Sequence, residues 1–77
     1  MDAKLAPVDC ERLIRFFEHH GFTRRRQKGS HLSMVKPGVA RPLVIPMHSD
    51  VAVFVIMSNL RTAGLTRDDL LAWLANQ

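Results

Sequence analysis

A chain of 77 residues is enough for one small domain, because a domain of this size buries only about 60% of the surface that its unfolded chain exposes. We therefore expect residues 1–77 to form a single domain of globular composition, without repeats or low-complexity runs. The one cysteine, Cys10, excludes an internal disulfide framework, and no stretch approaches the roughly 20 apolar residues of a membrane span. A cytoplasmic protein without membrane contact is expected.

The formal net charge is +4, but the charges are unevenly distributed along the chain. Between Phe22 and Pro46 there is no acidic residue, and six basic residues fall in this stretch: Arg24, Arg25, Arg26, Lys28, Lys36 and Arg41. The remaining five basic and seven acidic residues sum to −2. A basic stretch between mildly acidic flanks is typical of a surface that contacts phosphate groups, although a solvated strand face explains the charge alone equally well.

The first predicted helix starts after Asp9, whose carboxylate suits the N-cap, and ends before Gly21, a residue favoured at the C-terminal cap. Its apolar residues follow the i, i+3, i+4, i+7 spacing of one helix face: Cys10, Leu13, Ile14 and Phe17. His19 and His20 lie at its end, where a positive charge complements the helix dipole. Adjacent histidines point about 100° apart on a helix, so we do not expect them to share a metal ion.

Three strands are predicted next, at residues 22–27, 32–36 and 43–45. Lys28-Gly29 supplies the first turn, since glycine takes a positive φ at little cost, and Pro37-Gly38 supplies the second. Short turns between consecutive strands predict an antiparallel meander. Prolines on both sides of the third strand suit a strand at the edge of the sheet.

Residues 51–57 are continuously apolar and rich in β-branched side chains, which alone favours a buried strand. Length and context favour a helix, because extension to Ala63 places an apolar stripe on one face and Gly64 ends it. The stripe comprises Val53, Ile56, Met57, Leu60 and Ala63. Phe54 and Val55 fall outside the stripe, which indicates either a partner surface or a deeply packed helix.

A capping box formed by Thr66 and Asp69 predicts a short last helix, whose inner face carries Leu70, Leu71, Trp73 and Leu74. The predicted elements together give an α+β fold in the order α-β-β-β-α, with a short C-terminal helix. Helices that pack on one face of the sheet would leave its other face open.

The candidate functional stretch is the turn and strand that contain His31. In this strand Leu32 and Met34 share one face, and His31 lies on the other. If Leu32 and Met34 face the core, the imidazole stands on the open face beside a basic strand. Histidine titrates near neutral pH and can act there as a general acid or base. A strand-end histidine that only forms hydrogen bonds would explain the same position.

Two other side chains are weaker candidates for a part in the chemistry of His31. Ser30 is a weaker candidate for a nucleophile, because no Asp or Glu lies near His31 in the sequence to orient a Ser-His pair, and turn formation explains its presence. His48 follows the third strand and either takes part in catalysis as a second histidine or has a structural role there. We predict no metal site and no cofactor.

Four segments, in this order, resemble the HicA (YcfA-like) toxin family: Gly21-Phe22, Arg26-Gln27-Lys28-Gly29-Ser30-His31, Pro46-Met47-His48 and Ala63-Gly64-Leu65-Thr66. The resemblance covers most of the chain. It implies a fold similar to the double-stranded RNA-binding domain, and the activity of a messenger RNA interferase that a HicB antitoxin neutralises. It also implies that His31 is the catalytic histidine.

On this hypothesis the protein is the toxin of a type II toxin–antitoxin system, an endoribonuclease that cleaves mRNA without a metal ion. The residues expected to bind RNA are Arg24, Arg25, Arg26, Lys28, Ser30 and Lys36. Two other functions stay open. One is a non-catalytic RNA-binding module of the same fold, in which His31 would be dispensable. The other is a small protein-interaction domain that uses the apolar helix at residues 51–57 and shows no salt-dependent binding to nucleic acid.

Overall fold

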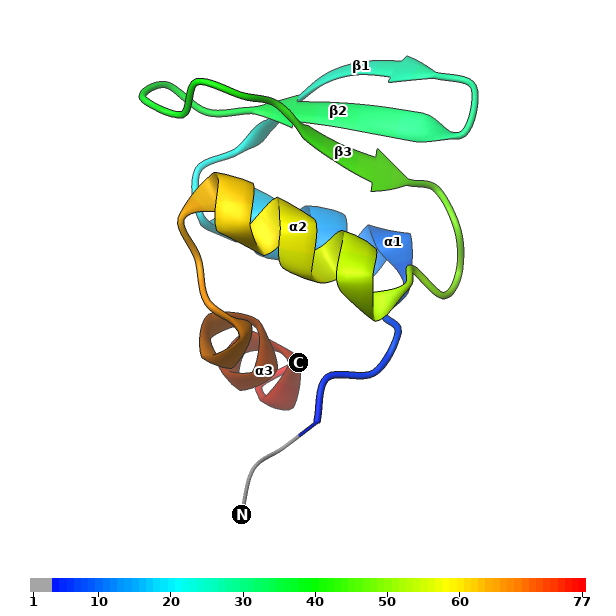
Figure 1. Ribbon diagram of the computed structural model, residues 1–77, viewed down its shortest axis with the longest axis vertical. Helices are drawn as coiled ribbons and strands as arrows, with labels where there is room; N and C mark the ends of the chain where they lie inside the picture. The colour runs from blue at the N-terminus through cyan, green and yellow to red at the C-terminus, as the bar shows by residue number, and fades with distance from the viewer. Residues whose placement is uncertain (1–3) are drawn as a thin grey trace.

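The computed structural model describes residues 4–77, which form a three-stranded antiparallel sheet with helices against one of its faces (Figure 1). The elements are α1 Cys10–His19, β1 Thr23–Lys28, β2 His31–Val35, β3 Leu43–Pro46, α2 Val53–Ala63 and α3 Arg67–Ala75. The strands lie in the order β1-β2-β3, so each one pairs with its neighbour in the chain. The α+β class, the meander and the short last helix are as predicted.

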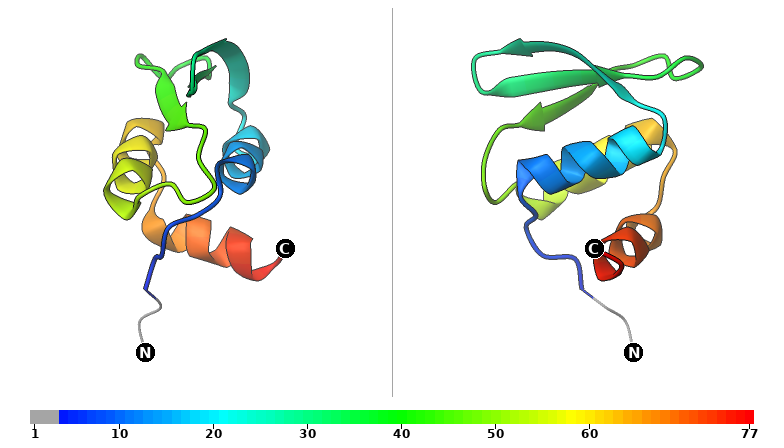
Figure 2. Two further views of the ribbon diagram at one scale, coloured as in Figure 1. Left: turned by 90° about the vertical axis from the view of Figure 1, so that its right-hand side faces the viewer. Right: turned by 180° about the vertical axis from the view of Figure 1, so that it is seen from behind.

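The helices form two layers beneath the sheet. α1 and α2 lie side by side against the sheet, and α3 lies on their far side, away from the strands (Figure 2). Among residues 4–77 no helix covers the opposite face of the sheet, which is therefore the open face. Every element except β1 contributes fully buried side chains to the core, among them Phe16, Phe17, Met34, Leu43, Ile45, Ile56, Leu60 and Leu70.

Helix α1 is capped and buried largely as predicted. The Asp9 carboxylate accepts a hydrogen bond from the Glu11 N–H at 3.0 Å, and Gly21 has a φ of +93° just after the helix. The predicted stripe is buried, but Phe16, which lies outside it, is buried as well. Its ring packs edge-on against Trp73 of α3, with 5.8 Å between the ring centroids. A second apolar face on α1 is needed because α3 adds a further layer.

The hairpin between β1 and β2 has its turn at Gly29-Ser30, and the prediction of a Lys28-Gly29 turn was wrong by one residue. Lys28 still belongs to β1 and pairs with His31, the first residue of β2. Gly29 has a φ of +59°, whereas the φ of Ser30 is not positive. A type I′ turn would require a positive φ at both residues. A glycine at the first central position is the type II′ arrangement, which fixes this register.

Residues from Val53 onward form the helix α2, which confirms the choice of helix over strand. Ile56 and Leu60 are fully buried, while Phe54 is 77% exposed. The helix starts two residues later than predicted, because Val51 pairs with Val8 in an isolated antiparallel bridge. The long apolar run thus divides into a bridge residue and a helix that packs on the sheet.

Asn59 of α2 closes the outer edge of β3. The backbone N–H of Val44 donates to Asn59 Oδ1 at 3.1 Å, and Asn59 Nδ2 donates to the Val44 carbonyl at 2.9 Å. The same Nδ2 also donates to the Val55 carbonyl at 3.2 Å. One buried amide side chain therefore replaces the donor and acceptor that another strand would offer to Val44.

The last helix begins with the predicted capping box. The Asp69 N–H donates to Thr66 Oγ1 at 3.1 Å, and the Thr66 N–H donates to the Asp69 carboxylate at 2.8 Å. Leu70 is its fully buried residue, and Trp73 and Leu74 pack against the core from its periphery. Across residues 4–77, no helix combines the length and apolar character that crossing a membrane requires.

Candidate functional site

His31 is the first residue of β2 and is exposed on the open face of the sheet. The next residue, Leu32, and then Met34 point into the core with 3% and 0% exposure, as the strand alternation predicts. Its cross-strand neighbours are Lys28 on β1 and Pro46 on β3. Strand pairing on both sides therefore fixes the backbone of His31, while its imidazole stands in solvent.

A β-bulge divides the arginines of β1 between the two faces of the sheet. Arg24 pairs with Met34 and Arg26 pairs with Ser33, so the intervening Arg25 has no partner. Residues paired across two strands share a face, so Arg26 lies on the open face with Ser33, whereas Arg24 lies on the helix side with Met34. Without the bulge, the two-residue alternation would have placed both arginines on one face.

The position of Arg24 is confirmed by its ion pairs with α1. Its guanidinium nitrogens lie 3.6 Å from a carboxylate oxygen of Glu11 and 3.6 Å from one of Glu18. All three side chains are about half exposed, so these pairs add little to stability. They do hold the charge of Arg24 on the helix side, away from His31.

Lys36 also lies apart from His31. It follows the last residue of β2, and its Nζ lies 5.7 Å from the centroid of the Phe22 ring. Its side chain lies along Gly21, where its Cε would be 3.2 Å from an added Cβ. Of the six residues predicted to bind RNA, Arg26, Lys28 and Ser30 adjoin His31, Arg25 sits at the bulge, and Arg24 and Lys36 lie elsewhere.

His48 lies in the segment that follows β3, at the same end of the sheet as His31. The Met47 N–H donates to the Ser30 carbonyl at 2.7 Å, which joins this segment to the hairpin turn. The His48 carbonyl accepts from the Cys10 N–H at 3.0 Å, so its backbone also ties the segment to the start of α1. The side chain of His48 is exposed. His48 therefore has a structural role through its backbone and leaves its imidazole available.

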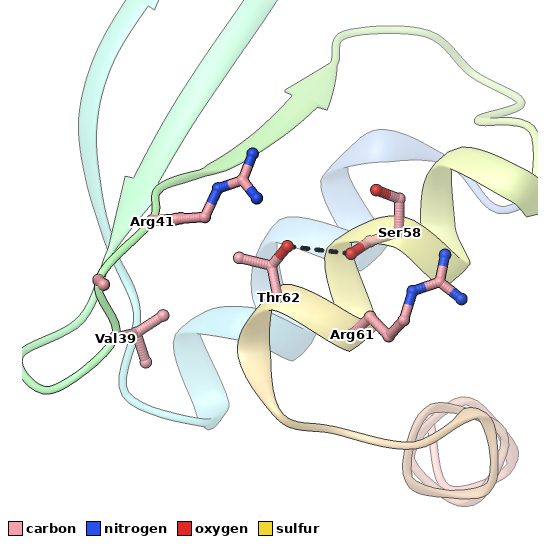
Figure 3. A pocket seen from close by; sticks show the side chains of 6 residues that line it. Val39, Arg41, Ser58, Arg61 and Thr62 are labelled. Carbon is pink, nitrogen blue, oxygen red and sulfur yellow. Dashed lines mark hydrogen bonds between the residues drawn. The ribbon is translucent and has the colours of Figure 1, made fainter.

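No sequence pattern predicted the groove between α2 and the segment before β3. One part of the groove has a volume of about 460 Å³ and is lined by Val39, Ala40, Arg41, Ser58, Arg61 and Thr62 (Figure 3). A second part of about 300 Å³ shares Arg41, Ser58 and Thr62 and extends to Val44 and Phe54. The two walls lie far apart in the chain, and neither carries a recognisable motif.

A third hollow, of about 390 Å³, lies between the end of α1 and α3 and includes His19, His20, Asp69 and Trp73. The ring of His20 packs edge-on against Phe16, with 4.7 Å between the centroids. Burial lowers the pKa of His20, the charges of His19 and Lys36 lower it further, and the charge of Asp69 partly opposes them. The neutral imidazole is thus the form that suits this packing. In residues 4–77 no group of three His, Cys, Asp or Glu side chains is placed to hold a metal ion.

A three-stranded antiparallel sheet with helices on one face and a histidine beside basic residues on the other defines an α+β domain with the arrangement of the double-stranded RNA-binding domain. The model of the family described as the HicA toxin of bacterial toxin–antitoxin systems matches residues 10–65, and the chain belongs to this family. A search of the curated proteins finds no match. The matched region runs from the start of α1 past the end of α2 and contains His31, whereas α3 lies beyond it. Membership makes the protein a toxin and implies an RNA substrate and an antitoxin partner.

Proposed function

We propose that this toxin is an endoribonuclease that cleaves messenger RNA in the cytoplasm, with His31 as its acid–base group. The observation that carries the proposal is the position of His31, whose exposed imidazole stands on a paired strand beside Lys28 on the open face. A positioned acid or base contributes roughly 10²–10⁴-fold to such a reaction. Placement on a strand with pairing on both sides supplies the positioning.

The proposed chemistry uses RNA, the side chains on this face and an acid at the same end of the sheet. His31 removes the proton of a ribose 2′-OH, and the 2′ oxygen attacks the adjacent phosphorus. The bond to the 5′ oxygen breaks, and that oxygen takes a proton from an acid, for which His48 at the same end of the sheet is a candidate. The products are a 2′,3′-cyclic phosphate and a 5′-OH. Lys28 and Arg26 offset the negative charge that develops on the phosphoryl oxygens.

Replacement of His31 tests the proposal directly. His31→Ala should abolish cleavage of RNA and leave the melting temperature nearly unchanged, because an exposed side chain fills no core space. His19→Ala is the matched control, since it removes another exposed histidine from the end of α1. Cleavage should persist in excess chelator and leave cyclic phosphate ends. Cleavage by His31→Ala at the wild-type rate would place the catalytic group elsewhere, whereas RNA binding without cleavage by the wild type would indicate a non-catalytic RNA-binding module.

We further propose that the antitoxin is HicB-like and covers the open face around His31. Arg26 and Lys28 lie on this face, and residues 22–46 include no acidic residue, so an acidic partner would relieve the repulsion between these charges and exclude RNA from the face. Hydrogen exchange on the toxin co-expressed with its antitoxin should show protection of β1 and β2. Protection confined to α2, with RNA still cleaved, would contradict this arrangement.

A further inference from the structure

The groove between α2 and the segment before β3 is cationic, because Arg41 and Arg61 line it. Figure 3 shows Arg41 extending toward α2, where Ser58 and Thr62 face it, and Arg61 on the same helix. No acidic residue lines either part of the groove. Within residues 4–77, neither arginine has a carboxylate within 4.0 Å, whereas Arg24 has two. The Thr62 hydroxyl donates to the Ser58 carbonyl at 3.2 Å, which leaves two guanidinium groups and the Ser58 hydroxyl as donors suited to phosphate oxygens.

The same groove continues into an exposed apolar region. Phe54 is 77% exposed and Val44 is 44% exposed, and they are the large hydrophobic side chains most exposed among the described residues. An aromatic ring held on a helix beside unpaired arginines is the arrangement that proteins use to stack the bases of single-stranded nucleic acid. The ring offers a face to any base, and the arginines hold the backbone.

The edge of β3 disfavours an added strand from a protein partner as the occupant. Such a strand would need the outward N–H and carbonyl of Val44, and the Asn59 side chain already bonds both. A nucleic acid strand needs no backbone pairing with the sheet. The charges, the exposed ring and the closed edge together favour RNA.

The groove is continuous with the face that carries His31. Val44 at its rim pairs with Ser33, which lies two residues from His31 on the same face of β2. Two residues of a strand span about 7 Å and neighbouring strands lie about 4.8 Å apart. A strand of RNA whose phosphate lies at His31 can therefore reach Phe54 within a few nucleotides.

We propose that this groove, formed by Arg41, Arg61 and Phe54, holds the single-stranded RNA that flanks the cleaved bond. The proposal rests on the proposed function, because it concerns the same substrate. It assigns the two arginines to phosphates and Phe54 to a base, and it makes α2 part of the RNA surface together with the sheet.

The test measures binding to an uncleavable probe, so that it does not depend on catalysis. The probe is a single-stranded RNA oligonucleotide with 2′-O-methyl sugars, which lack the attacking 2′-OH, and its binding to the intact protein is measured over a range of salt concentrations. The double variant Arg41→Ala/Arg61→Ala should weaken binding and make the slope of log K against log salt shallower by about 1.4, at 0.7 per phosphate. The control Arg15→Ala/Arg67→Ala removes the same charge from exposed positions outside the groove and should leave the slope unchanged.

The aromatic contact has a separate signature. Phe54→Ala should weaken binding roughly 5- to 150-fold without changing the salt slope, and Phe54→Leu, which keeps apolar bulk but loses the ring, should weaken it nearly as much. Because Phe54 is exposed, the melting temperatures of these variants should match that of the wild type.

Three results would overturn the proposal. One is an equal loss of binding in the groove and control arginine variants, and a second is wild-type binding by Phe54→Ala. The third is wild-type RNA binding by all groove variants together with loss of antitoxin binding, which would make the groove a protein-docking surface. Failure of the proposed function is recognised separately: the probe would bind in a groove-dependent way, yet cleavable RNA would remain uncut.

Discussion

Replacing Asn59 tests how much one buried amide contributes to holding α2 against the sheet. Asn59 is 8% exposed and makes three hydrogen bonds, two to Val44 and one to the Val55 carbonyl. At about 0.5–1.5 kcal/mol net for each, the sum is roughly 1.5–4.5 kcal/mol. Water can reach part of the exposed edge at Val44, so Asn59→Ala should lower the free energy of unfolding by about 2–3 kcal/mol. A domain of this length has about 4–12 kcal/mol in total.

Asn59→Asp separates hydrogen bonding from packing, because aspartate nearly matches the shape of asparagine. Its carboxylate can still accept from the Val44 N–H, but its second oxygen would face the Val44 and Val55 carbonyls, which lie 2.9 Å and 3.2 Å from Nδ2. The aspartate variant should therefore be less stable than the alanine variant, and lowering the pH should restore part of its stability by protonating the carboxyl group.

Urea unfolding followed by circular dichroism measures these changes, and a loss of 2–3 kcal/mol corresponds to a fall of about 8–24 °C in the melting temperature. Asn76→Ala is the matched control. The Nδ2 of Asn76 donates to the Ala72 carbonyl at 2.9 Å at an exposed helix end, so the loss of this hydrogen bond should change stability little. An aspartate variant more stable than the alanine variant would mean that Asn59 acts by filling space, which would refute the hydrogen-bond argument.

Two further perturbations test the helix ends. Gly64→Ala should cost about 1 kcal/mol, because Gly64 has a φ of 73° and nothing crowds an added Cβ, and Gly64→Asn should cost less. Equal losses in thermal melts would contradict this conformational origin. Burial lowers the pKa of His20 below its ordinary value of 6.5, so the folded protein binds fewer protons than the unfolded chain. The free energy of unfolding should therefore be highest above about pH 6.5 and fall as the pH drops through the lowered pKa. His20→Asn should lessen this fall, and an unchanged pH profile would exclude His20 as its source.

Local sequence patterns predicted the fold well, because each element carries its own signal. The α1 spacing, the strand alternation around His31 and the capping box at Thr66 each depend on residues close together in the chain. The exposure of His31 opposite the buried Leu32 and Met34 followed from the two-residue period alone. These features would be recognisable in any chain of similar pattern.

The composition of the candidate site was harder to predict, because it depends on pairing across strands. The bulge at Arg25 reverses the face of Arg24 relative to Arg26, and no residue type in Arg-Arg-Arg marks where a bulge will fall. The turn lies one residue later than predicted, because Lys28-Gly29 and Gly29-Ser30 both contain the glycine that a turn needs. The register between β1 and β2, rather than the type of any single residue, decided both outcomes.

The groove at Arg41 and the buried face of Phe16 escaped prediction for a related reason. The groove forms where α2 meets the loop before β3, and Phe16 is buried where α1 meets α3. The periodicity of the sequence predicts neither contact. Phe16 is buried because α3 forms a layer behind α1. The exposure of Phe54 was one of two alternatives that the apolar run left open, and only the packing of α2 on β3 decides between them.

The strand order β1-β2-β3 also has a kinetic consequence. Both strand pairings join neighbours in the chain, and the first closes through the two-residue loop Gly29-Ser30, so little chain entropy is lost before native contacts form. The sheet can therefore assemble from local hairpins on a fast timescale. The bridge between Val8 and Val51 joins the paired segments that lie farthest apart in the sequence of the described chain. We therefore expect this contact between the N-terminal segment and the start of α2 to form last.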